Sequence, residues 1–205
     1  MLCQGFQIGF SGLSIAFRSD FPLSVAPEMQ PFAQEDGSAT DSFHLALLQE
    51  PMEGRGELLH SGRELLAYAQ GEDRLFLFRG MQDAQGRMPA CRITARREHE
   101  LWLPPAVGQQ LSTAHRLSGL LCIEQLLLHH RALLFHSSVV CHKDRVLLFS
   151  GPSGMGKSTQ ARLWEQCFGA KTLNGDRCVL RLGKEGITGG GSPWCGSSGI
   201  YDPAC

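Results

Sequence analysis

The sequence predicts an α/β protein with two domains, a β-rich domain over residues 1–112 and a phosphate-loop domain over residues 113–205. Short segments in which apolar and polar residues alternate fill the first part, which is typical of half-buried strands. In the second part, an apolar strand, a glycine-rich loop and a helix follow one another between residues 145 and 168. These patterns predict an antiparallel β-rich module followed by an α/β module that holds a phosphate-binding loop.

The β-rich part contains seven short alternating segments, separated by turn sequences such as Gly71-Glu72-Asp73 and Pro104-Pro105. The segments cover residues 6–10, 13–17, 43–48, 64–68, 74–78, 91–95 and 100–103. The stretch from residue 22 to residue 42 has no clear period and contains several residues that favour turns. We therefore expect a long loop there.

The second part is expected to contain both helices and strands. Leucines recur at helical spacing over residues 113–130, with Ser112 as a candidate N-cap, which predicts a well-buried helix. A second helix is expected over residues 159–168, ended by Gly169, with an apolar face made of Leu163, Trp164, Cys167 and Phe168. Apolar runs predict strands over residues 133–141, 145–150, 171–173 and 177–182.

The most specific motif is Gly151-Pro152-Ser153-Gly154-Met155-Gly156-Lys157-Ser158, which matches the phosphate-binding pattern G-x-x-x-x-G-K-[ST]. Glycines allow the backbone N–H groups of such a loop to converge on phosphate oxygens, at the positive end of the following helix. Lys157 is expected to reach the β- and γ-phosphates, and Ser158 to bind Mg²⁺. The predicted nucleotide-binding residues are Gly151, Ser153, Gly154, Met155, Gly156, Lys157, Ser158 and Thr159.

Two polar residues outside the loop are further candidates for chemistry. Asp176 follows a predicted strand in Asn174-Gly175-Asp176-Arg177, where a carboxylate can contact the metal or act as a base for an accepting hydroxyl. The alternative is an aspartate that only stabilises a glycine-containing turn. His136 lies on an apolar strand, where a histidine is either a hydrogen-bonded core residue or part of a site.

Composition excludes several classes of function. The 205 residues carry a net charge of −1 with no basic stripe, which argues against nucleic acid and against an anionic membrane as partners. No apolar run is long enough to span a membrane, and residues 1–17 do not resemble a signal peptide. The eight cysteines show no C-x-x-C spacing, so we expect reduced, buried thiols and a cytoplasmic location.

Three of these segments, taken in order, resemble the HPr kinase/phosphorylase-like family. They are the strand 134–140 with His136, the loop with its following helix start, and Asn174-Gly175-Asp176-Arg177. The likeness is closer to small, mostly uncharacterised relatives, in which the segment Gly-Ser-Pro-Trp-Cys-Gly-Ser-Ser-Gly at residues 191–199 also recurs. The resemblance covers residues 113–201 and implies a phosphate-loop kinase domain related to that of ATP-dependent phosphoenolpyruvate carboxykinase.

The resemblance implies a kinase that uses ATP and Mg²⁺ to phosphorylate a hydroxyl, in particular a serine of a protein, a peptide or a small molecule. In that reading Lys157, Asp176 and His136 are catalytic, with Asp176 taking the acceptor proton, and Ser158 and Asp176 contact the metal. The acceptor itself and the oligomeric state stay open. Two alternatives are a nucleotide-binding accessory or degenerate kinase without transfer, and an enzyme like phosphoenolpyruvate carboxykinase.

The chain departs from the family pattern at three places. Gly175 stands where the HPr kinases have the first of two acidic residues, and their Glu-x-Arg-Gly-x-Gly segment has no counterpart. The sequence also ends at Cys205, before the C-terminal elements of the family, which predicts a kinase domain that is incomplete at its C-terminus. These departures argue against HPr itself as the substrate.

Overall fold

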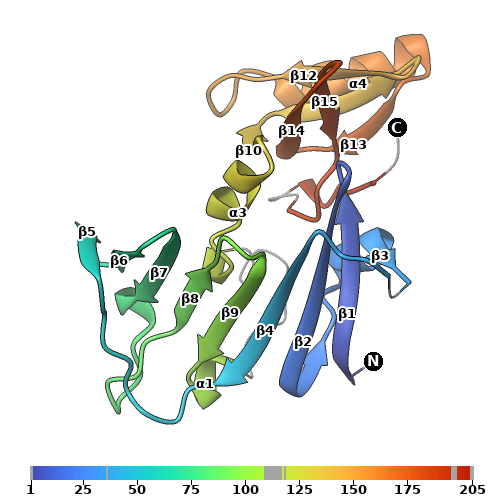
Figure 1. Ribbon diagram of the computed structural model, residues 1–205. Coiled ribbons are helices and arrows are strands. Elements are labelled where there is room, and N and C mark those ends of the chain that lie inside the picture. Colours follow the sequence, from blue (N-terminus) through green and yellow to red (C-terminus); the bar gives the residue numbers. More distant parts are fainter. Residues whose placement is uncertain (1, 36, 109–116, 118, 195–197, 204–205) are drawn as a thin grey trace. The chain divides into compact units, whose positions relative to one another are not determined.

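The computed structural model describes all residues except 1, 36, 109–116, 118, 195–197 and 204–205 (Figure 1). The chain forms two compact units. Unit 1 comprises residues 1–8, 14–26 and 34–126. Unit 2 comprises residues 9–13, 27–33 and 127–205.

A nine-stranded mixed sheet forms most of unit 1, while the hairpin tip Gly9–Leu13 and Ala33 of β3 are assigned to unit 2. The strand order is β3-β1-β2-β4-β9-β8-β7-β6-β5. Strands β2, β4 and β9 are parallel neighbours, and β9 to β5 are joined by antiparallel pairs. The strands are β1 (Leu2–Phe10), β2 (Leu13–Ser24), β3 (Ala33–Gln34), β4 (Asp41–Leu47), β5 (Glu57–Ser61), β6 (Leu65–Gln70), β7 (Asp73–Phe78), β8 (Ala90–Ile93) and β9 (Glu98–Leu103).

Alternation along the strands gives this sheet one buried face. In β4 the odd-numbered residues Asp41, Phe43 and Leu45 are buried, while His44 is exposed. The ring of Phe43 stacks on that of Phe17, with centroids 5.8 Å apart. The period of two that predicted these strands therefore corresponds to the burial of every second side chain. Short helices connect parts of the chain: η1 (Pro27–Phe32), η2 (Arg79–Met81) and α1 (Pro105–Gly108).

A buried polar pair joins two of these parallel strands. Nε2 of His99 lies 3.0 Å from Oδ1 of Asp41, and both side chains are 0 % exposed. The backbone N–H of Thr94 donates to Nδ1 of His99 at 3.0 Å. Because Nδ1 accepts, the proton of the ring is on Nε2, and the neutral imidazole donates it to Asp41. The sequence patterns gave no sign of this pair.

Unit 2 contains two three-stranded antiparallel sheets. One has the order β10-β14-β15 and the other β12-β11-β13. The strands are β10 (Ala132–His136), β11 (Ser138–His142), β12 (Arg145–Phe149), β13 (Lys171–Asn174), β14 (Arg177–Gly183) and β15 (Gly186–Gly190). Two helices accompany them, α3 (Ile123–His129), which begins in unit 1, and α4 (Lys157–Phe168).

The two faces of β11 pack against different layers. Val139 packs with Leu173 of β13 and with Cys178 of β14. This buried cluster joins the two small sheets. Val140 points to the opposite face and packs with Ala161 of α4. The sheet β12-β11-β13 is thus covered by α4 on one face and by strands of the other small sheet on the other face.

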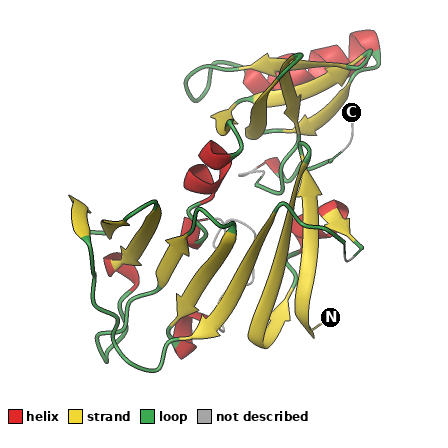
Figure 2. Ribbon diagram, in the orientation of Figure 1, coloured by secondary structure: helices red, strands yellow, loops and turns green. Residues whose placement is uncertain are grey.

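The predicted α/β fold class, with a phosphate-loop kinase domain of the HPr kinase and carboxykinase type, is wrong. The described residues form a mostly β protein with only two helices of seven or more residues, α3 and α4 (Figure 2). A doubly covered parallel sheet is absent from this part of the chain, because β11 lies between β12 and β13 and pairs antiparallel with both. The hairpin turn Lys143–Asp144, with φ of 50° and 58°, folds β12 back on β11.

Several predicted elements also differ in detail. A single strand was expected over residues 133–141. The structure instead has two strands, β10 and β11, which are separated by Ser137 and belong to different sheets. The helix expected over residues 113–130 lies partly outside the described residues, and a turn at Leu121–Cys122 precedes α3. The predicted N-cap Ser112 and domain boundary at 112 also lie outside them. Strands β5 and β15 and helix η1 were not expected.

Most cysteines in the described part of the chain whose redox state the structure defines are free thiols. Four described cysteines are free, namely Cys91, Cys122, Cys167 and Cys178, whereas Cys141 is disulfide-bonded, contrary to expectation. Burial raises the pKa of the Cys178 thiol to about 11, so this side chain is an apolar core residue at neutral pH. Among the described helices, none combines the length and the apolar character needed to cross a membrane.

Candidate functional site

The glycine-rich loop leads from β12 directly into α4. Gly154 and Gly156 have φ of 82° and 86°, in the left-handed region that favours glycine. Gly156 occupies the N-cap position of α4, and no side chain caps the helix there. The first N–H groups of an α-helix have no acceptor within the helix, so they are available to an anion at this end.

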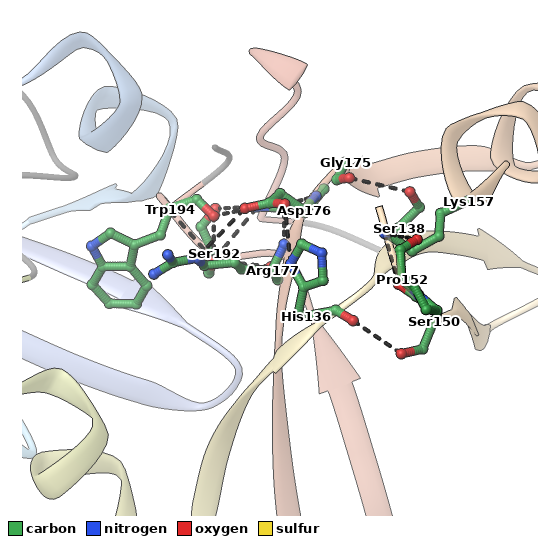
Figure 3. A network of polar contacts seen from close by, with 12 residues as sticks. His136, Ser138, Ser150, Pro152, Lys157, Gly175, Asp176, Arg177, Ser192 and Trp194 are labelled. Atoms are coloured by element: carbon green, nitrogen blue, oxygen red, sulfur yellow. Dashed lines mark hydrogen bonds and ion pairs between the residues drawn. The ribbon is translucent and has the colours of Figure 1, made fainter. Parts of the chain in front are cut away.

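Lys157 is the first residue of α4, and its side chain folds back over the loop. Nζ donates to the carbonyl oxygens of Gly151 at 2.9 Å and of Pro152 at 3.3 Å. This half-buried ammonium therefore lies over the segment that the motif assigns to phosphate binding (Figure 3). A phosphate oxygen is a stronger acceptor for it than a neutral carbonyl.

His136 and Asp176 lie together at the break between the two small sheets. Nδ1 of His136 is 3.1 Å from Oδ1 of Asp176, and the two side chains are 58 % and 25 % exposed. His136 also pairs in register with Arg177 across β10 and β14. Nε of Arg177 is 3.5 Å from Oδ2 of Asp176, so each carboxylate oxygen has a nitrogen partner. Since an ionised carboxylate only accepts, Nδ1 of His136 carries the proton in this contact.

Serine side chains tie this pair to the start of the loop. The hydroxyl of Ser150, directly before Gly151, donates to the carbonyl of His136 at 3.1 Å. Ser138 is paired with Phe149 at the end of β12, and its hydroxyl donates to the carbonyl of Gly175 at 3.1 Å. The loop, the histidine strand and the Asp176 turn thus form one connected group of contacts, drawn in Figure 3.

The remaining predicted residues lie on the surface of the loop and of the first helical turn. Ser153, Gly154, Met155, Ser158 and Thr159 are all exposed, and Met155 is exposed to 72 %. The hydroxyls predicted to face Mg²⁺ and the α-phosphate are therefore open to solvent. No group of three or more His, Cys, Asp or Glu side chains in the described ranges could hold a metal ion.

The helix after the loop packs differently from the expectation. Ala161 is its buried residue, while Leu163 and Phe168 are 43 % and 57 % exposed. Trp164 is half-buried and contacts the ring of Phe168 at a centroid distance of 4.7 Å. The predicted end of the helix is confirmed, because Gly169 adopts a left-handed conformation and its N–H donates to Glu165.

Sequence reasoning missed two buried residues of this site. Asn174 and Ser192 are both 0 % exposed, and their side chains hydrogen-bond the turn that carries Asp176. Both residues lie in motifs on which the family resemblance rests, Asn-Gly-Asp-Arg and Gly-Ser-Pro-Trp. The available signal was the asparagine two residues before Asp176, a residue type that often closes a turn with its side chain.

Comparisons of the chain with protein-family models, with curated proteins and with solved structures found no match. The resemblance to the HPr kinase/phosphorylase-like family therefore rests on the three sequence motifs and stays a prediction.

Proposed function

We propose that unit 2 binds Mg·ATP at residues 151–159 and transfers the γ-phosphate to a hydroxyl group of a protein, a peptide or a small molecule. The observation that carries this proposal is the position of the His136–Asp176 pair, which the Ser150 hydroxyl ties to the start of the phosphate-loop motif. The proposal rests on this local arrangement and not on a kinase fold.

The loop supplies the positive groups that a polyphosphate needs. On binding, Lys157 would exchange its two loop carbonyls for phosphate oxygens, and the N–H groups at the start of α4 would face the β-phosphate. The exposed Ser158 hydroxyl and a carboxylate oxygen of Asp176 suit Mg²⁺, which prefers a few oxygen ligands together with phosphate and water. Bound Mg²⁺ would neutralise charge on the transferred phosphate.

Asp176 is the group available to accept the proton of the acceptor hydroxyl. Its carboxylate is 25 % exposed, and the contacts with His136 and Arg177 orient its two oxygens. A positioned general base contributes about 10²- to 10⁴-fold to the rate of such a reaction. His136, exposed to 58 %, has its ring held through Nδ1–H, so that Nε2 carries the lone pair and can accept a hydrogen bond from a donor group of the substrate.

Nucleotide binding without transfer is the second candidate, and one observation favours it. A Cβ at position 175 would collide with the side chain of Ser198, so a second carboxylate in this turn would require Ser198 to move. The site therefore has one acidic residue where the family that it resembles has two. A degenerate kinase would keep the nucleotide-binding loop but would no longer transfer the phosphate.

Incubation with γ-labelled ATP and Mg²⁺ tests the two candidates. We expect label to be transferred to water or to a serine peptide by the wild type, and the transfer to be lost in Lys157→Ala and Asp176→Ala. Nucleotide binding should be weakened most in Lys157→Ala and less in Asp176→Ala, which loses one oxygen ligand of the metal. Nucleotide binding without any transfer would support the second candidate, and equal transfer by all three proteins would contradict the assigned site.

A further inference from the structure

The turn that carries Asp176 is closed by the side chain of a fully buried residue. Oδ1 of Asn174 accepts the backbone N–H groups of Asp176 and Arg177, each at 2.8 Å. Asparagine side chains stabilise turns in this way because they replace a backbone carbonyl. Asn174 thus fixes the backbone on both sides of the carboxylate.

The other end of the same amide holds a second segment of the chain. Nδ2 of Asn174 donates to the carbonyl of Ser192 at 2.8 Å and to that of Trp194 at 3.4 Å. The hydroxyl of Ser192 lies 3.1 Å from the carbonyl of Arg177, to which it donates, and accepts the N–H of Trp194 at 3.3 Å. Figure 3 shows these contacts converging beside Asp176.

Two further bonds complete the attachment of the turn. The carbonyl of Gly175 accepts the hydroxyl of Ser138, and the carbonyl of Asp176 accepts the N–H of Ser137 at 2.8 Å. Every backbone polar group from the carbonyl of Gly175 to the carbonyl of Arg177 is therefore hydrogen-bonded. A turn held so completely has little freedom, although the Asp176 side chain that it carries is partly open to solvent.

We infer that Asn174 and Ser192 are positioning residues, which hold the Asp176 carboxylate against His136 and toward the phosphate loop. This inference rests on the proposed function. A reacting group must be held to within about 0.5 Å of its productive place. A displacement of about 1 Å can cost about 10²-fold in rate, which gives a buried hydrogen-bond network a direct effect on transfer.

The test compares Asn174→Ala and Ser192→Ala with Val140→Ala. Val140 is equally buried in unit 2 but packs on the α4 side of β11, away from the turn. We expect kcat for label transfer to fall about 10²-fold in both turn variants. The KM for Mg·ATP should stay within about threefold, because the loop contacts are untouched, and Val140→Ala should change neither constant.

A second readout does not depend on activity. Long-range ¹H–¹⁵N spectra report which nitrogen of His136 carries the proton, and His136→Gln assigns the signals. In the wild type we expect Nδ1–H, held by Asp176, and in Asn174→Ala a shift toward Nε2–H, as in Asp176→Ala. Should Asn174→Ala fail to fold, Ser192→Ala gives the same test.

The two readouts separate the two proposals. If the wild type transfers no label but the His136 tautomer changes in Asn174→Ala, the positioning holds and the proposed function fails. If the wild type transfers label and the turn variants behave like Val140→Ala in both readouts, the inference is overturned while the proposed function stands.

Discussion

Two histidine–aspartate pairs in this molecule have nearly the same nitrogen–oxygen distance but differ in their exposure to solvent. His99 and Asp41 in unit 1 are 3.0 Å apart and fully buried, and His136 and Asp176 in unit 2 are 3.1 Å apart and partly exposed. They also use different ring nitrogens, Nε2 in His99 and Nδ1 in His136. In the buried pair both nitrogens are occupied by the protein, while the open pair leaves Nε2 of His136 for a ligand. Exposure and the second ring nitrogen therefore separate a structural pair from a candidate catalytic one.

The largest loss of stability is expected from breaking the buried pair. Asp41→Ala leaves the Nε2–H group of the neutral His99 ring buried without its acceptor, and an unsatisfied buried donor costs about 1–3 kcal/mol. That is a large part of the stability of an ordinary domain. The measurement is the free energy of unfolding in urea, with Ser42→Ala, the half-buried neighbour on the other face of β4, as control. A loss below about 1 kcal/mol would show that the pair is not structural.

For the exposed pair, His136 and Asp176, we expect a substitution to lower phosphate transfer rather than stability. Asp176→Asn keeps the shape and can still accept from His136, so we expect the free energy of unfolding to change by less than about 1 kcal/mol. Label transfer should fall by about 10²- to 10⁴-fold, because an amide cannot accept the hydroxyl proton. Unfolding curves and single-turnover transfer measure the two quantities on the same preparation. A stability loss as large as that of Asp41→Ala would remove the distinction between the pairs.

A third pair gives the smallest expected effect. Nε2 of His44 is 2.8 Å from Oδ1 of Asp20, on the exposed face of the nine-stranded sheet, with the side chains 53 % and 60 % exposed. We expect Asp20→Asn to change the free energy of unfolding by less than about 1 kcal/mol, because solvent screens such pairs. It should leave label transfer unchanged. A larger loss of stability would mean that distance, rather than exposure, decides the contribution of these pairs.

The phosphate loop could be predicted from the sequence because its geometry is local. Gly154 and Gly156 take up the left-handed conformations, and Lys157 begins the helix, all within a few residues of one another. The individual strands could also be predicted, since period-two alternation reflects which side chains are buried. The turn at residues 142–144 indicates the β11–β12 hairpin, but nothing in the run 138–149 indicates that β13 pairs with the other edge of β11.

The residues that the sequence patterns did not reveal act over long separations. Asn174 and Ser192 are 18 positions apart and meet only after β13, β14 and β15 have formed. Asp41 and His99 are 58 positions apart and meet only because β4 and β9 are parallel neighbours. From the residues alone, His136 and Asp176 were two separate candidates, and only the family resemblance implied that they share a site. Strand pairing decides such contacts, and it depends on the whole sheet rather than on any local pattern.

Equilibrium binding of Mg·ATP tests the central claim most directly. Titration calorimetry on the wild type should give saturable binding with one site per chain. Lys157→Ala should weaken it by about 10- to 100-fold, the equivalent of one charge-assisted hydrogen-bonded group. Asp20→Asn serves as the control variant, since it also removes one charge but lies on the exposed face of the nine-stranded sheet, outside the loop. Absence of binding to the wild type, or equal affinity for the wild type and Lys157→Ala, would contradict the assignment of this loop as a nucleotide site.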